Sequence, residues 1–175
     1  GWAKPRDNNR ASSHTRTYGD TECRGSFETL SLGHRYQTDT AEIVVRGLTD
    51  AHKDSLLSLM YALLEGASEN LEISRDDIDA TLSYSRNQRS IVIFDTVPGG
   101  AGASKNIAEN FDSVVKEAHA RVSRCDCGVE TSCFGCLRNA FNDRYHDQLR
   151  RKDALRHLEA MIQFDKVTST VMQSS

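Results

Sequence analysis

The chain has 175 residues, of which 38% are hydrophobic and 27% charged, with a formal net charge of −3 at pH 7. This length suits one domain with its own core, and the composition excludes collagen-like, disulfide-scaffold and wholly disordered chains. The acidic balance argues against a protein that binds polyanions over its whole surface. No apolar run approaches the roughly 20 residues that span a bilayer, and no signal-peptide pattern opens the chain, so we expect no membrane segment and a cytoplasmic location.

The two ends of the chain differ from its middle. Residues 1–30 are polar and lack periodic apolar positions, so we expect a partly ordered polar arm there. Residues 31–165 carry the patterns of one folded domain, and residues 166–175 predict a flexible tail.

The first strand and helix of this domain are predicted from residues 40–66. TAEIVV at residues 40–45 is a short β-branched run, which indicates a buried strand. A helix follows, with Thr49 or Asp50 as its N-cap and Gly66 near its end. Its apolar positions recur at helical spacing and are Leu56, Leu59, Met60, Leu63 and Leu64.

A hairpin and two more helices complete the expected domain. IDATLSYS at residues 78–85 alternates as a half-buried strand does, SIVIFD at residues 90–95 is apolar on both faces like a central strand, and RNQR between them indicates a hairpin. One long helix is then predicted, with Ser104 as its N-cap and an apolar stripe that ends at Val122. A terminal helix is expected from Asp153 to about Phe164. The sum is an α+β domain, with a small mixed or antiparallel sheet and packed helices.

Four of the five cysteines fall within twelve residues, in CDCGVETSCFGC at residues 125–136. A structural zinc site needs four ligands at tetrahedral angles, and short Cys-x₂-Cys loops bring two thiolates together without strain. The pattern predicts a closed zinc site, with no open position for catalysis, near the C-terminus. Its ligands are Cys125, Cys127, Cys133 and Cys136.

Two other uses of these cysteines stay open. Disulfides would suit an oxidising compartment, but neighbouring pairs stabilise a domain poorly, and an iron–sulfur cluster would use the same four thiolates. Cys23, in the polar arm, is expected to be an incidental thiol.

A glycine-rich loop follows the predicted central strand and precedes a helix, in IVIFDTVPGGAGASKN. Backbone N–H groups in such loops bind phosphate in some proteins, but the Gly-Lys-Ser/Thr ending of a Walker A motif is absent. The alternative is a sharp structural turn. The residues of this candidate anion or turn site are Asp95, Gly99, Gly100 and Gly102.

Basic residues are enriched after the cysteines, with six between residues 137 and 157 against three acids. A solvated helix face with interspersed charges explains such a segment, and contact with nucleic-acid phosphates is the functional alternative. We take five of these residues as candidate phosphate contacts. They are Arg138, Arg144, Arg150, Arg151 and Lys152.

Several motifs together resemble one family, over most of residues 31–160. They are GHRYQTD at 33–39, FDTVPGGAG at 94–102, RCDC at 124–127, CFGC at 133–136, and RNAFNDRYHDQLRRKDAL at 138–155. The chain resembles the MZB zinc-binding module found toward the C-termini of superfamily-two DEAD/DEAH-box helicases, including mitomycin-repair-type helicases and a component of the DISARM phage-defence system.

The resemblance implies a non-catalytic accessory domain of a bacterial helicase system for DNA repair or phage defence. The chain lacks Walker A and DEAD/DEAH motifs, so a parent or partner protein would supply the ATP-driven motor. Zinc is the implied cofactor, and DNA and a helicase core or partner subunit are the implied partners. A second hypothesis stays open, in which the domain docks on a helicase core or partner subunit and does not contact DNA.

Overall fold

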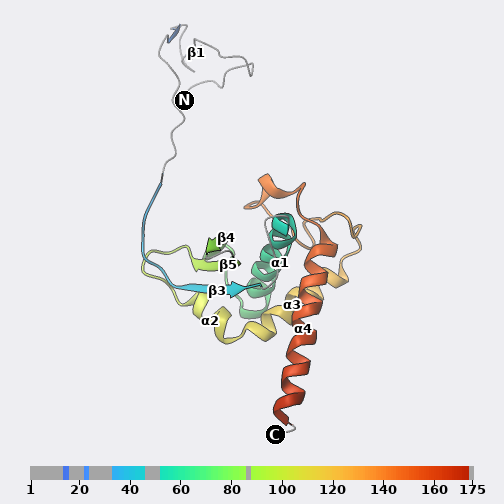
Figure 1. The fold of residues 1–175 in the computed structure, drawn as a ribbon. Helices are drawn as coiled ribbons and strands as arrows, with labels where there is room; N and C mark the ends of the chain where they lie inside the picture. Colours follow the sequence, from blue (N-terminus) through green and yellow to red (C-terminus); the bar gives the residue numbers. More distant parts are fainter. Residues whose placement is uncertain (1–13, 16–21, 24–32, 46–51, 86–87, 174–175) are drawn as a thin grey trace. The chain divides into compact units, whose positions relative to one another are not determined.

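The structure is a computed structural model that describes residues 14–15, 22–23, 33–45, 52–85 and 88–173 (Figure 1). The chain divides into two units, residues 1–35 and residues 36–175. In the first unit, strands β1 (His14–Thr15) and β2 (Glu22–Cys23) form an antiparallel pair within the segment expected to be a polar arm. The proposed helix caps Thr49 and Asp50 lie outside the described residues.

The second unit contains a three-stranded antiparallel sheet. Its strands are β3 (Thr40–Val44), β4 (Ile78–Ser85) and β5 (Gln88–Asp95), in the order β3-β5-β4. The central strand β5 pairs on both sides, so that Ile93 lies opposite Ala41 of β3 and Ala80 of β4. Ile91 and Ile93, two positions apart, are fully buried on one face. The predicted α+β class, the hairpin and the central strand are confirmed, and the sheet is antiparallel.

Helix α1 (Lys53–Leu71) is central to the unit. Every residue from Ser55 to Ala67 is buried, because α1 packs against α3 (Phe111–Arg124), α4 (Arg151–Gln173) and β4 (Figure 1). The predicted end near Gly66 is wrong, since α1 continues to Leu71. Gly66 is required inside the helix because a Cβ there would lie 2.7 Å from the Cβ of Ala118 in α3, so the residue marks close helix packing and not a helix end.

Two helices replace the single long helix expected after the glycine loop. They are α2 (Ala103–Glu109) and α3, and Asn110 separates them. The backbone N–H of Asn110 makes the last helical bond of α2, to the carbonyl of Asn106 at 3.1 Å, and the backbone of Asn110 then leaves helical geometry, at φ −113° and ψ 25°. Ser104 is not the N-cap of α2, since Gly102 holds that position and Ser104 is buried within the helix.

Helix α4 joins the core through contacts with α1. The Ser55 hydroxyl hydrogen-bonds His157 Nε2 at 2.5 Å, and the Ser58 hydroxyl accepts from the backbone N–H of Arg150 at 3.0 Å. Apolar side chains of α1, β5, α3 and α4 form one continuous core. Among the described residues, no helix combines the length and the apolar character that crossing a bilayer requires.

Candidate metal centre

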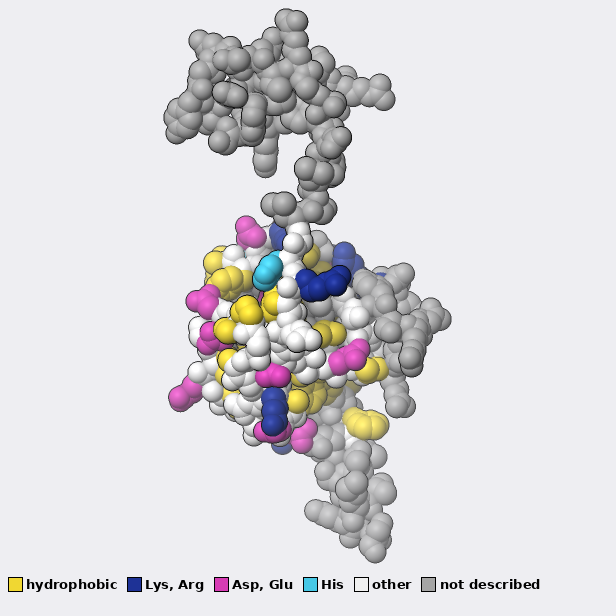
Figure 2. Space-filling view, turned by 90° about the vertical axis from the view of Figure 1, so that its left-hand side faces the viewer, with side chains coloured by type: hydrophobic (Ala, Val, Ile, Leu, Met, Phe, Trp, Pro, Cys, Tyr) yellow, Lys and Arg dark blue, Asp and Glu magenta, His cyan; other side chains and the backbone are white. Residues whose placement is uncertain are grey.

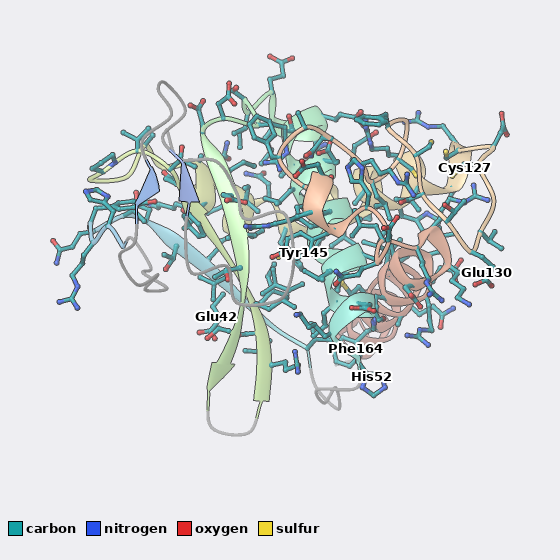
Figure 3. All side chains as sticks on the ribbon, turned by 90° about the horizontal axis from the view of Figure 1, so that it is seen from above. Glu42, His52, Cys127, Glu130, Tyr145 and Phe164 are labelled. Atoms are coloured by element: carbon teal, nitrogen blue, oxygen red, sulfur yellow. The ribbon has the colours of Figure 1, made fainter. Side chains whose placement is uncertain are left out.

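The four clustered cysteines come together immediately after α3. Cys125 is the C-cap of α3, where the backbone becomes extended, and Cys136 lies in a turn in which its N–H donates to the carbonyl of Cys133 at 3.1 Å. All four Sγ atoms lie within 4.8 Å of one another. Figure 3 shows Cys127 and Glu130 at the edge of the domain far from Glu42 of β3, with α1 between them.

The Sγ–Sγ distances fit one tetrahedral metal ion. Four sulfurs at the zinc–sulfur distance of about 2.3 Å would lie roughly 3.8 Å apart at tetrahedral angles. In the structure Cys125 Sγ lies 3.4 Å from the sulfurs of both Cys127 and Cys133, and Cys136 Sγ lies 3.7 Å from Cys127 Sγ and 3.9 Å from Cys133 Sγ. A disulfide would need about 2.05 Å, so none of these pairs is bonded. The donor set therefore suits zinc.

Backbone N–H groups point at the sulfurs and favour their ionised form. Gly135 N–H donates to Cys133 Sγ and Cys133 N–H to Cys136 Sγ, each at 3.3 Å. A hydrogen bond from the backbone of Cys127 lowers the pKa of Cys125 to about 7, whereas burial raises the pKa of Cys127 to about 12 and also raises that of Cys136. A metal would therefore displace protons from the thiols of Cys127 and Cys136 as it binds.

The cysteine loop is tied to α3 and α4. Arg121 of α3 donates from Nε to the carbonyl of Cys136 at 3.0 Å. The first N–H groups of a helix have no partner within it, and two of those in α4 bond to the loop instead. Arg151 N–H donates to the Thr131 carbonyl and Lys152 N–H to the Val129 carbonyl, both at 2.9 Å. The shape of the cysteine loop therefore fixes where α4 begins.

Most of the five candidate phosphate contacts gather around this loop. Arg138 donates to the hydroxyls of Ser132 and Thr131, and Lys152 pairs with Glu130 at 2.5 Å. Arg150 is exposed, and Arg151 is half-buried with its Nε enclosed.

The fifth, Arg144, lies apart on the short 3-10 helix η2 (Asp143–Tyr145), with its guanidinium 4.7 Å from the centre of the Tyr145 ring. On the face shown in Figure 2, Lys and Arg side chains lie scattered among acidic and apolar ones and form no continuous basic surface.

Asp95 closes the glycine loop from within. Its carboxylate is fully buried and accepts backbone N–H groups from Ala101 at 2.6 Å, Ala103 at 3.1 Å and Ser104 at 2.7 Å. Burial favours a higher pKa, but the hydrogen bonds from Ser104, Ala101 and Ala103 outweigh it and hold the pKa of Asp95 below its ordinary value. The N–H groups that would bind an external phosphate thus already bond to this carboxylate.

The other members of the candidate loop site form the turn. Gly99, Gly100 and Gly102 all have positive φ. A Cβ at Gly100 would also collide with the side chain of Asp39, which precedes β3. The loop therefore joins three segments of the domain, namely β5, α2 and the chain before β3.

We expect Asp95→Asn to lower the free energy of unfolding by about 2 kcal/mol, because an amide nitrogen would face an N–H donor and the helix cap would be lost. The folded pKa is depressed, so the stabilisation by wild-type Asp95 is complete above the unfolded pKa of about 3.9 and is lost as the pH falls through the folded pKa. Urea unfolding at several pH values measures both the loss of stability in Asp95→Asn and the pH dependence of the stability in the wild type. An Asn variant as stable as the wild type at pH 7 would contradict this role.

Residues 59–137 match the family model described as MZB, the MrfA Zn-binding domain, and the match includes all four clustered cysteines. Residues 59–137 are an MZB domain. The resemblance predicted from the motifs is thereby confirmed.

Relatives of this MZB domain are much longer proteins. The chain is 25% identical over 150 residues to Druantia protein DruE of Escherichia coli (strain UMEA 4076-1), covering 74% of this chain and 8% of that protein. Two solved structures are described as DUF1998 helicase MrfA bound to DNA and as the same helicase bound to DNA and AMPPNP. They share the fold at TM-scores of 0.63 and 0.59 and 15% identity, covering 85% and 84% of this chain and 20% and 19% of those chains.

A buried ion-pair network beside the MZB cysteines was missed by the sequence interpretation. Glu65 of α1 is 8% exposed, and its carboxylate accepts from Arg75 Nε at 3.1 Å and from Asn139 Nδ2 at 2.6 Å, with Arg121 Nη2 at 3.5 Å. Arg121 also bonds the Cys136 carbonyl, so the network joins α1 to the cysteine loop. The available signal was Glu65 itself, an acid between Leu64 and Gly66 in an otherwise apolar stretch.

Proposed function

We propose that this chain is a non-catalytic, zinc-binding accessory domain of a cytoplasmic helicase system, and that it contributes to DNA binding in DNA repair or phage defence. One observation carries the proposal: the four sulfurs of the MZB domain lie within 4.8 Å of one another, at separations that suit a single tetrahedral ion. Cys125, Cys127, Cys133 and Cys136 would hold the ion. Four thiolates would fill the coordination shell of zinc and leave no position for water or substrate, which supports a structural role.

The helicase setting is supported by the kinds of proteins in which this fold occurs. MrfA is described as a helicase and was solved with DNA, and this chain spans about a fifth of it. An ATP-driven motor would therefore lie in the remainder of a longer protein or in a partner. The zinc site would stabilise the segment after α3, where the chain from Asp126 to Arg150 forms only turns and the short helix η2.

DNA contact is supported by the basic side chains around the cysteine loop. Arg138, Arg151 and Lys152 bond residues 129–132 through side-chain or backbone groups, and Arg150, next to Arg151, is exposed. Such contacts would bind phosphates without reading base sequence, so affinity would fall as salt rises. The glycine loop has its own internal ligand in Asp95, which favours the turn over an anion site.

We expect Arg150→Glu to weaken DNA binding about tenfold or more at low salt, since hydrogen bonds to charged groups contribute about 1.5–3 kcal/mol. The slope of log affinity against log salt concentration should also fall by about one, the value expected for one lost phosphate contact. Fluorescence anisotropy with labelled DNA across a salt series measures both. Lys105→Glu is the matched control, because Lys105 is 74% exposed on α2 and the charge change is the same. If both variants lose the same DNA affinity, the loss is due to the change in net charge, and Arg150 makes no specific contact with a phosphate.

A second candidate function is docking on a helicase core or partner subunit without DNA contact. Two observations favour it: the net charge of −3, and the exposed apolar side chains of the cysteine loop, with Phe134 67% and Val129 49% exposed. Wild-type protein that fails to bind DNA at low salt, but binds the partner through these side chains, would establish this alternative.

A further inference from the structure

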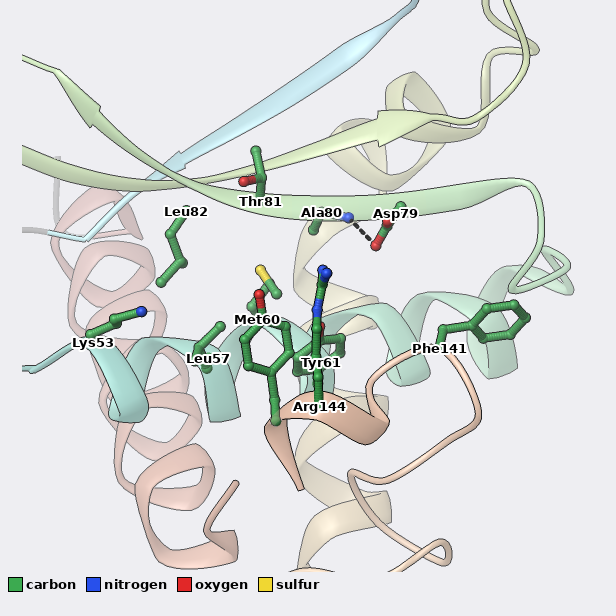
Figure 4. A pocket seen from close by; sticks show the side chains of 11 residues that line it. Lys53, Leu57, Met60, Tyr61, Asp79, Ala80, Thr81, Leu82, Phe141 and Arg144 are labelled. Atoms are coloured by element: carbon green, nitrogen blue, oxygen red, sulfur yellow. Dashed lines mark hydrogen bonds between the residues drawn. The ribbon is translucent and has the colours of Figure 1, made fainter. Parts of the chain in front are cut away.

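A pocket opens between β4, α1 and η2. Its volume is about 220 Å³, far more than the roughly 10–15 Å³ that one water molecule requires. Figure 4 shows Leu57, Met60 and Tyr61 of α1 on one side, Leu82 of β4 above them, and Arg144 rising from η2 toward β4. Two aromatic side chains after the cysteine loop, Phe141 and Tyr145, complete this part of the lining.

The base of the pocket is apolar and buried. Leu57, Met60 and Tyr61 are each less than 5% exposed, and the rings of Tyr61 and Tyr145 lie 6.1 Å apart. Burial, followed by the charge of Asp79, raises the pKa of Tyr61 to about 12, so its hydroxyl stays protonated at neutral pH. The site therefore offers flat apolar surfaces beside a phenolic hydrogen-bonding group, which suits a planar heteroaromatic ligand.

Phe141 stands at the rim of this pocket with 56% of its surface exposed. Its backbone is held on both sides, since its N–H donates to Asn139 Oδ1 at 2.9 Å and the buried Asn142 donates to the Leu137 carbonyl at 2.8 Å. The guanidinium of Arg75 lies 5.9 Å from the ring centre. An exposed ring on a fixed backbone has little conformational entropy left to lose when a base stacks on it.

Positive charge lines the pocket between Lys53, at the end far from Phe141, and Arg144, near its middle (Figure 4). Arg144 and Lys53 line the pocket and are exposed, and within the described part of the chain no carboxylate forms a salt bridge with either. The one acid in the lining, Asp79, accepts the backbone N–H of Ala80 at 2.8 Å. Two cations without a carboxylate partner among the described residues, in one pocket with an exposed aromatic ring, match the chemistry of single-stranded nucleic-acid sites, where rings stack on bases and cations contact phosphates.

We infer that this pocket holds an unstacked base of single-stranded DNA, with the base against Phe141, a phosphate of the same strand near Arg144, and the strand continuing toward Lys53. The inference rests on the proposed DNA binding and adds the form of DNA that the domain prefers. Bases in a duplex have their faces covered by neighbouring base pairs, so duplex DNA could not use this ring. Stacking would also be tolerant of sequence, because every base has a π face.

The test is fluorescence anisotropy of the zinc-loaded chain with a labelled oligothymidylate and with a hairpin duplex, over a salt series. Phe141→Ala is expected to lower single-strand affinity about 5- to 100-fold, to leave the salt slope unchanged and to leave duplex affinity within about twofold, because a lost stack removes no phosphate contact. Phe141→Trp should retain single-strand binding. Phe164→Ala, at a residue 75% exposed on α4, is the control and should change nothing.

Other outcomes separate this inference from the proposed function. Normal single-strand affinity in Phe141→Ala, together with weakened binding in Arg150→Glu, would overturn the base pocket and leave DNA binding intact. Parallel losses for single strand and duplex, or loss of a protein partner alone, would also overturn it. A wild-type chain that binds neither DNA at low salt would end both proposals. Thermal melts of each variant establish that it is folded.

Discussion

Cys136→Ser is expected to remove the ordered structure of residues 125–173. Cys136 is fully buried, and structural zinc contributes on the order of 10 kcal/mol in small domains, as much as the whole stability of many. Because the N–H groups of Arg151 and Lys152 bond the cysteine loop, loss of the ion should also fray the start of α4. Circular dichroism and thermal melting measure the loss of helix, and a chelator should reproduce it in the wild type.

The fifth cysteine supplies the control for this experiment. Cys23 lies in β2, in the other unit of the chain, so Cys23→Ser should leave helicity and melting temperature unchanged. Full helicity and an unchanged melting temperature in Cys136→Ser would rule out a structural metal at this position.

Glu65→Gln is expected to lower the free energy of unfolding by about 3–5 kcal/mol. It removes the negative charge that two guanidinium groups share, those of Arg75 and Arg121, whose side chains are only 13% and 18% exposed. Arg121 keeps Glu69 as a partner, but Arg75 loses the carboxylate it pairs with, and a buried charge left without a counter-ion destabilises a fold by about this amount. For a chain of this size the melting temperature should fall by about 10 °C or more.

Glu69→Gln is the matched control for the buried pair. Glu69 lies one turn further along α1 and also pairs with Arg121, but its side chain is 38% exposed. Water screens such pairs, so we expect a loss of at most about 1 kcal/mol. If Glu69→Gln is as damaging as Glu65→Gln, then burial of the network does not determine its contribution.

Local patterns were sufficient for the strands and for the cysteine cluster. The sequence of β4 alternates apolar and polar residues, as a half-buried strand does, and that of the central strand β5 contains a continuous apolar run. The two cysteine pairs are close enough in sequence for one chain segment to bring the four sulfurs together. The family followed from the same short motifs.

Long-range contacts explain what the sequence interpretation missed. A glycine usually favours a helix end, but Gly66 lies within α1 because α3 approaches it at Ala118. Ser104 resembles an N-cap, yet Asp95 of β5 bonds the first N–H groups of α2. The partners of Glu65 lie 10, 56 and 74 positions away, so only the folded chain brings them together.

The measurement that most directly tests the central claim is the metal content of the purified chain, by elemental mass spectrometry, in the wild type and in Cys133→Ser. The account predicts one zinc ion per wild-type chain and a loss of that zinc in the variant. Iron with inorganic sulfide, or a wild-type chain that is folded and contains no metal, would contradict the zinc site on which the proposed function depends.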